Sequence, residues 1–195
     1  MLRFQKSAWL LTALLFAASP GFAHTGEQLN GLTSGLLHPV TGLDHVVAMI
    51  AVGLWGGILG KPAIWLLPVV FPLAMAISAA AGVAGIPLPG AEVGIALSGV
   101  VLGLMVLFAA KPPIWTAALL VGIFAVFHGH AHGVELPEAA NSMVYAVGFV
   151  VSTGVLHLIG IAIGQLGNWP AGKIAVRAAG AAIALAGGAF LTGLA

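Results

Sequence analysis

Charged side chains are scarce in this sequence of 195 residues, which has five Asp or Glu and six Lys or Arg. Charged residues make up 6% of the chain and hydrophobic residues 61%, whereas soluble domains carry about 25% charged residues. Eleven charged groups cannot make the surface of a chain of this size compatible with water. The shortage therefore excludes an ordinary soluble domain and predicts an integral membrane protein with lipid as its partner.

Cysteine is absent, so neither disulfide bonds nor thiolate metal sites are available to this chain. The sequence also has no basic cluster interleaved with aromatic residues, which argues against nucleic acid as a partner. A Gly-x4-Gly-Lys-Ser/Thr phosphate loop is missing as well, and no soluble domain is present to hold one. The chain therefore cannot use ATP by that route.

The first 23 residues have the pattern of a secretory signal peptide, 1–23. A basic start precedes an apolar core from Ala8 to Ala18, and a Pro-Gly breaker precedes small residues that end at Ala23. Cleavage after Ala23 would leave His24 as the mature N-terminus. The alternative is an uncleaved first transmembrane helix, but the apolar core is short for a span of about 20 residues.

Six apolar runs follow, each long enough to cross about 30 Å of hydrocarbon as a helix. They are Gly31 to Leu59, Pro62 to Ala84, Ala91 to Ala110, Pro113 to Gly133, Ala139 to Leu166 and Ile174 to Leu194. Short connections with prolines at several boundaries separate them, as expected where helices stop and start. The predicted fold class is all-α, a polytopic bundle of six transmembrane helices that forms a single domain over residues 24–195.

The basic residues predict how the bundle is oriented. If the signal exports the mature N-terminus, all basic residues of the mature chain fall on the cytoplasmic side, namely Lys61, Lys111, Lys173 and Arg177. This agrees with the positive-inside rule. The topology comes from the order of the runs alone, so the agreement is an independent check. All four glutamates fall on the outer side. The expected location is the inner membrane, with the mature N-terminus in the periplasm.

The end of the fourth run carries three histidines and a glutamate within nine residues, Phe127 to Glu135. On a helix, His128 and His132 are four residues apart and share a face, and Glu135 falls on the same stripe. Two nitrogens and one oxygen suit a borderline divalent metal such as Ni, Co, Cu or Zn. His130 lies on a different face, so one ion would not reach all three histidines without a break in the helix.

The first run carries the other half of the predicted site. Asp44 is the ionised residue well inside this span, where a charge costs roughly 2.5 to 3.5 kcal/mol and needs a partner. No Lys or Arg lies at that depth, so a divalent cation, with His45 beside it, is the most economical partner. His38 and His45 would be about 10 Å apart along a regular helix. They could hold one ion together only if the helix began near Pro39, a favoured first helical position.

The two motifs are predicted to meet in the outer half of the membrane. The first helix runs inward and carries its motif early, whereas the fourth runs outward and carries its motif at its end. Together they predict an intramembrane site, open to the outside, with four to six ligands drawn from His38, Asp44, His45, His128, His132 and Glu135. The alternative is that these histidines only form hydrogen bonds between helices, but ionisable residues inside a membrane more often serve a function.

Two further histidines stay open to more than one interpretation. His24 would offer an α-amino group and an imidazole after cleavage, or it is an ordinary polar start of the mature chain. His157 stands alone among apolar neighbours, and such a histidine is more often packed and hydrogen-bonded than a metal ligand or relay.

Both histidine motifs resemble those of a known protein family. The motifs His38-Pro39 with Gly42-x-Asp44-His45, and Phe127-His128-Gly129-x-Ala131-His132-Gly133-x-Glu135, resemble those of the HupE/UreJ family of hydrogenase and urease accessory proteins. The start His24-Thr25-Gly26 and the six-span length also resemble this family. The resemblance implies a secondary transporter for nickel, with cobalt as a related substrate. It assigns metal binding to His38, Asp44, His45, His128, His132 and Glu135, and places His130 at a variable position.

Transport without ATP must follow a gradient, the membrane potential or a separate partner. For a divalent ion, an inside-negative potential of 100 mV favours uptake by about 4.6 kcal/mol, so uptake is predicted rather than export. A transporter is predicted, and not an enzyme. An intramembrane metalloenzyme is the alternative, but it would lack a spare base once Glu135 is a ligand. A bis-histidine haem protein would leave Asp44 and Glu135 unused beside the iron. The sequence leaves open the preferred ion, proton coupling and the oligomeric state, a homo-oligomer included.

Overall fold

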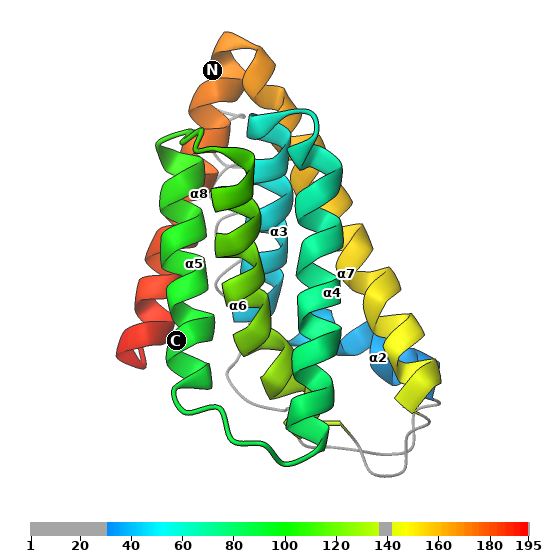
Figure 1. Ribbon diagram of the computed structural model, residues 1–195. Coiled ribbons are helices and arrows are strands. Elements are labelled where there is room, and N and C mark those ends of the chain that lie inside the picture. Colours follow the sequence, from blue (N-terminus) through cyan, green and yellow to red (C-terminus); the bar gives the residue numbers. More distant parts are fainter. Residues whose placement is uncertain (1–30, 137–141, 195) are drawn as a thin grey trace, which may run out of the picture.

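The computed structural model describes residues 31–136 and 142–194. These residues form seven α-helices and one 3-10 helix, with no β-strand among them. In chain order the elements are α2 (Gly31–Thr41), α3 (Leu43–Leu59), α4 (Ala63–Val83), α5 (Ala91–Leu107), α6 (Ile114–Val134), α7 (Ser142–Gln165), η1 (Leu166–Asn168) and α8 (Pro170–Thr192). The all-α prediction is confirmed for this part of the chain (Figure 1). The predicted signal peptide, its cleavage site and His24 lie outside the described residues.

Four of the described helices are long and apolar enough to cross a membrane: α4, α6, α7 together with η1, and α8. Helices α2 and α3 qualify only as a pair, bent by 81° at the break between them. Helix α5 is apolar but has 17 residues. The outward side chains agree with a lipid environment, since Ile77 and Leu185 are each 76% exposed. The chain therefore has four or five candidate spans in its described part, and the sixth stays a prediction.

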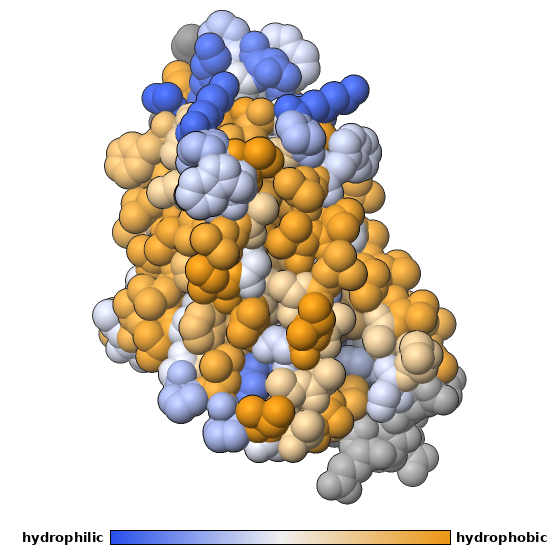
Figure 2. All heavy atoms as spheres, in the orientation of Figure 1, coloured by the Kyte–Doolittle hydropathy of each residue, from blue (hydrophilic) through white to orange (hydrophobic). Residues whose placement is uncertain are grey.

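Basic residues gather at one end of the bundle, where α3 joins α4, α5 joins α6 and α7 joins α8 (Figure 1). Lys61, Lys111 and Lys173 are exposed in or beside these connections. Figure 2 shows hydrophobic side chains over the middle of the visible face and hydrophilic ones at this end, uppermost in the view. This is the separation of charge that the positive-inside rule requires of a membrane protein.

Small residues allow the helices to approach one another closely. A Cβ added at Gly129 of α6 would run into the backbone of Met75 on α4, and one at Gly53 of α3 into the backbone carbonyl of His157 on α7. In lipid, where apolar burial drives association only weakly, such close backbone packing is a main source of helix association. The close contacts hold α3 against α7 and α4 against α6, and so fix the helices that carry the predicted ligands.

The first apolar run is two helices rather than one. Gly42 has an extended backbone (φ −94°, ψ 113°) between α2 and α3. The hydroxyl of Thr41 donates to the carbonyl of His38 at 2.8 Å and closes the last turn of α2. The predicted helix start at Pro39 is wrong, because Pro39 lies inside α2 and the break falls three residues later. The bend nonetheless takes His38 off the axis of α3, so its distance from His45 is no longer set by one regular helix.

Candidate metal centre

The predicted ligands of the described chain gather at the end of the bundle opposite the lysines. His38 comes from the last turn of α2 and His45 from the first turn of α3. His132 comes from the last turn of α6, and Glu135 directly follows that helix. Because α3 runs away from this end and α6 runs toward it, the two motifs meet here (Figure 1).

Three of these side chains form a compact cluster, His38, His132 and Glu135, which we call the outer triad. Their candidate ligand atoms all lie within 4.8 Å of one another. His132 Nδ1 is 2.8 Å from His38 Nε2, a distance at which one ring nitrogen donates a hydrogen bond to the other. Glu135 Oε2 is 3.3 Å from the same nitrogen of His38. Two imidazoles and one carboxylate at these distances are a donor set for a borderline divalent ion.

The carboxyl group of Glu135 is half exposed at the mouth of the site. Its contact with His38 holds the pKa of Glu135 below its usual value, against the opposing effect of burial. Glu135 is therefore an anion over the pH range in which imidazoles are neutral, and it supplies the negative charge of the triad.

Asp44 and His45 lie next to the triad. The Asp44 Oδ1 atom is 2.8 Å from His45 Nδ1 and also accepts the backbone N–H of His45 at 2.9 Å. A carboxylate on one ring nitrogen fixes the tautomer and leaves the lone pair of the other nitrogen free, as in many metal-binding histidines. The ring of His45 lies between two others, with its centroid 4.3 Å from that of His132 and 4.9 Å from that of His128.

Three histidines of the site each have one nitrogen held by the protein and one left over. His128 Nε2 is 2.9 Å from the Ser98 hydroxyl, and His132 and His45 are held as described above. The remaining atoms, His45 Nε2, His128 Nδ1 and His132 Nε2, are buried without a hydrogen-bond partner among the described residues. A buried polar atom without a partner costs about 1 to 3 kcal/mol, so three together require a reason. Each of these nitrogens is a candidate ligand for a cation, which would satisfy that atom.

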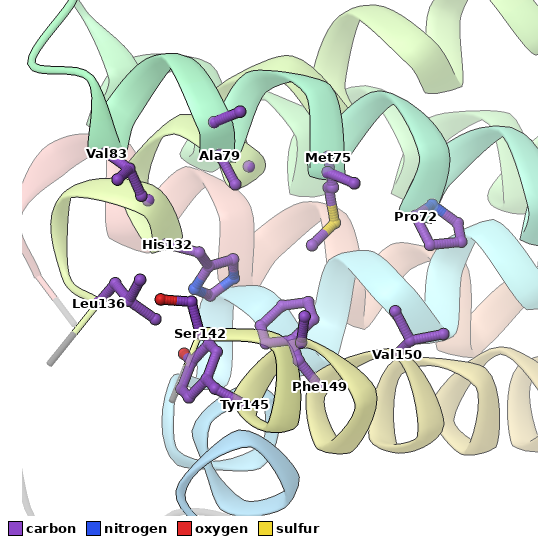
Figure 3. A pocket seen from close by; sticks show the side chains of 15 residues that line it. Pro72, Met75, Ala79, Val83, His132, Leu136, Ser142, Tyr145, Phe149 and Val150 are labelled. Carbon is purple, nitrogen blue, oxygen red and sulfur yellow. The ribbon is translucent and has the colours of Figure 1, made fainter. Parts of the chain in front are cut away.

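An apolar cavity of about 190 Å³ opens beside the triad, between α4, α6 and α7. Figure 3 shows the His132 ring facing this space, with Tyr145 and Phe149 of α7 on one side and Met75 of α4 on the other. The ring centroid of Phe149 is 4.5 Å from that of His132. The aromatic wall lowers the local dielectric, which strengthens every electrostatic interaction at the site.

A second cavity, of about 270 Å³, includes an acidic residue outside the predicted set of ligands. Asp44 lines it together with Glu92 from the first turn of α5. Two carboxylates on one cavity raise the local concentration of cations. In the sequence Glu92 is only a charge at the start of the third apolar run. The sequence feature that could have indicated Glu92 is the predicted position of this start, on the same side of the membrane as both histidine motifs.

The remaining predicted histidines lie elsewhere. His130 points away from the triad, and its Nε2 is 2.7 Å from the backbone carbonyl of Ile86, so it fastens α6 to the connection after α4. His157 lies deep in the bundle on α7 and is 1% exposed. The structure thus brings His38, Asp44, His45, His128, His132 and Glu135 to one end of the bundle and leaves His130 and His157 outside that group.

Comparison with known proteins agrees with the motifs. The model of the family described as HupE / UreJ protein matches residues 12–190. Protein HupE of Rhizobium leguminosarum bv. viciae is 45% identical over 190 residues, which cover 96% of this chain and 100% of that protein. No solved structure matches the chain. A match of this extent, with both motifs inside it, shows that the chain belongs to the HupE / UreJ family.

Proposed function

We propose that this protein takes up nickel ions, with cobalt as a related substrate, as a secondary transporter of the inner membrane. The observation that carries the proposal is the set of three buried imidazole nitrogens without partners beside the outer triad. Neutral imidazoles select borderline metals over Mg²⁺ and Ca²⁺, which prefer oxygen ligands alone. The carboxylates of Asp44 and Glu135 offset the charge of the ion.

The direction of transport follows from the charge of the ion and the proposed topology. In this topology α5 completes six spans, the lysine-bearing end faces the cytoplasm, and the metal centre and the mature N-terminus face the periplasm. An inside-negative potential of 100 mV then favours entry of a divalent ion by about 4.6 kcal/mol. The ion would bind from the periplasm through the acidic cavity of Asp44 and Glu92, and would leave on the other side.

Transport fits the site better than the two other chemistries considered. Hydrolytic metal catalysis needs a base beside the ion, and Glu135 is already in the triad. Haem ligation by two histidines needs a porphyrin between their rings. The centroid of His45 is 4.9 Å from that of His128 and 4.3 Å from that of His132, which leaves no room for a macrocycle. We therefore propose that the imported nickel serves the maturation of a nickel enzyme, hydrogenase or urease.

Nickel entry into vesicles tests this function. Full-length protein is reconstituted into liposomes, an inside-negative potential is imposed, and entry of radioactive nickel is measured. The His132→Ala variant is expected to lose most of the uptake because it removes a triad ligand. His130→Gln is the matched control on the same helix, since its amide can keep the bond to the Ile86 carbonyl. Equal nickel entry with wild-type protein, His132→Ala and protein-free liposomes would refute the proposal.

A further inference from the structure

Three more polar atoms lie deep in the bundle without a hydrogen-bond partner among the described residues: both ring nitrogens of His157 and the hydroxyl oxygen of Thr153. The two side chains are four residues apart on α7 and so share a face. They are 1% and 0% exposed, respectively. Packing alone would favour apolar side chains here, because each buried polar atom without a partner costs about 1 to 3 kcal/mol. The pair offers nitrogen and oxygen donors to a cation.

The position of this pair along α7 relates it to the outer triad. Phe149 of α7 packs against His132 of the triad. Thr153 follows one helical turn later and His157 another turn later, so His157 lies about 12 Å deeper than Phe149. Helix α7 continues to Gln165, eight residues beyond His157. His157 is therefore about midway between the metal centre and the end of the bundle that carries the lysines.

One aromatic side chain lies between the metal centre and the deeper pair of His157 and Thr153. Phe71 of α4 is fully buried, and its ring centroid is 5.6 Å from that of His128 and 5.5 Å from that of His157. The same phenyl ring thus contacts the imidazole of His128 and that of His157. His128 belongs to the metal centre, which we call the outer centre from here on. Pro68 and Pro72 flank Phe71 inside α4. Each proline removes a backbone hydrogen bond, so α4 resists bending least at this point.

We propose that His157 and Thr153 form a second, inner binding station for the transported divalent ion, and that Phe71 separates this station from the outer centre. The inference rests on the proposed transport function, because a moving ion needs a further set of donors along its path. The acidic residues of the described chain, Asp44, Glu92 and Glu135, all belong to the outer end. Neutral donors alone bind the ion weakly, which suits a station that the ion must leave quickly.

Transport and binding measurements on the full-length protein separate the inner station from the outer centre. His157→Ala is expected to slow nickel entry into liposomes about tenfold, while nickel affinity in equilibrium dialysis stays within about twofold because the outer ligands are intact. Thr153→Val keeps the shape of the side chain and should slow entry by about threefold. Ser152→Ala, the neighbouring hydroxyl on α7, is the matched control and should transport like the wild type.

Cobalt stoichiometry provides a readout that does not depend on transport. Phe71→Ala is expected to bind a second, weaker cobalt ion per chain, because the ring that separates the inner station from the outer centre is removed. The double variant Phe71→Ala/His157→Ala should lose that ion. A single ion in Phe71→Ala, or wild-type transport in both His157→Ala and Thr153→Val, would overturn the inner station. In that case nickel entry with wild-type protein would still support the proposed function. Absence of nickel entry with a second cobalt ion in Phe71→Ala would instead refute transport and keep the inner site.

Discussion

Replacing Asp44 with Asn removes one negative charge from the metal centre and changes the shape of the side chain little. An ion bound at His45 Nε2 would lie across the ring from Asp44, whose carboxylate is 2.8 Å from His45 Nδ1. The separation between the ion and the carboxylate is then about 7 Å. Coulomb's law for a divalent ion at that separation gives about 2 to 5 kcal/mol with an effective dielectric constant of about 20 to 40. Nickel affinity should therefore fall by at least about thirtyfold.

The assay is a nickel-binding isotherm of purified protein in lipid nanodiscs, with thermal unfolding measured on the same samples. Asp44→Glu is the charge-matched control and should retain most of the affinity. Thermal unfolding of the same samples without metal separates a loss of nickel affinity from a loss of the fold. Unchanged nickel affinity in Asp44→Asn would refute the electrostatic role of Asp44.

Three other predictions concern the pH dependence of nickel binding, the contact of Ser98 with His128 and the close packing at Gly129. Nickel binding should weaken as the pH falls, because ligating imidazoles must be neutral. The pKa of Glu135 is lowered by its histidine partner, so isotherms at several pH values should show loss of binding above the pH at which this carboxylate is protonated. Ser98→Ala frees Nε2 of His128 and should lower nickel affinity about tenfold in the same isotherms. Gly129→Ala places a Cβ against the backbone of α4 and should lower stability by about 1 to 3 kcal/mol. Gly154→Ala, whose added Cβ meets no atom of the described residues within 4 Å, should keep the stability of the wild type. Equal thermal unfolding of these two variants would contradict the packing argument.

Composition and spacing predicted much of the arrangement. The scarcity of charge predicts apolar helices, and the four-residue step from His128 to His132 places both on one face of α6. The direction of the runs predicts that the motif of α3 and that of α6 share one end of the bundle. These features depend only on helix geometry and on the order of the runs, so a sequence contains them.

The rest depends on tertiary contacts. The break at Gly42 could not be distinguished from the many glycines of this chain that only allow close packing, such as Gly53. Glu92 approaches Asp44 only because α5 packs beside α3. Similarly, a lone histidine in an apolar run does not reveal whether its nitrogens find partners. Only the packing around His157 shows that they have none within the part of the chain that the structure describes.

X-ray absorption at the nickel edge of the loaded protein tests most directly the claim that imidazoles from two antiparallel helices converge on the transported ion. The account predicts nitrogen and oxygen ligands with the multiple scattering typical of imidazole. His132→Ala should lower this signal, and His130→Gln should not. A spectrum with oxygen ligands alone, or one that His132→Ala leaves unchanged, would contradict it.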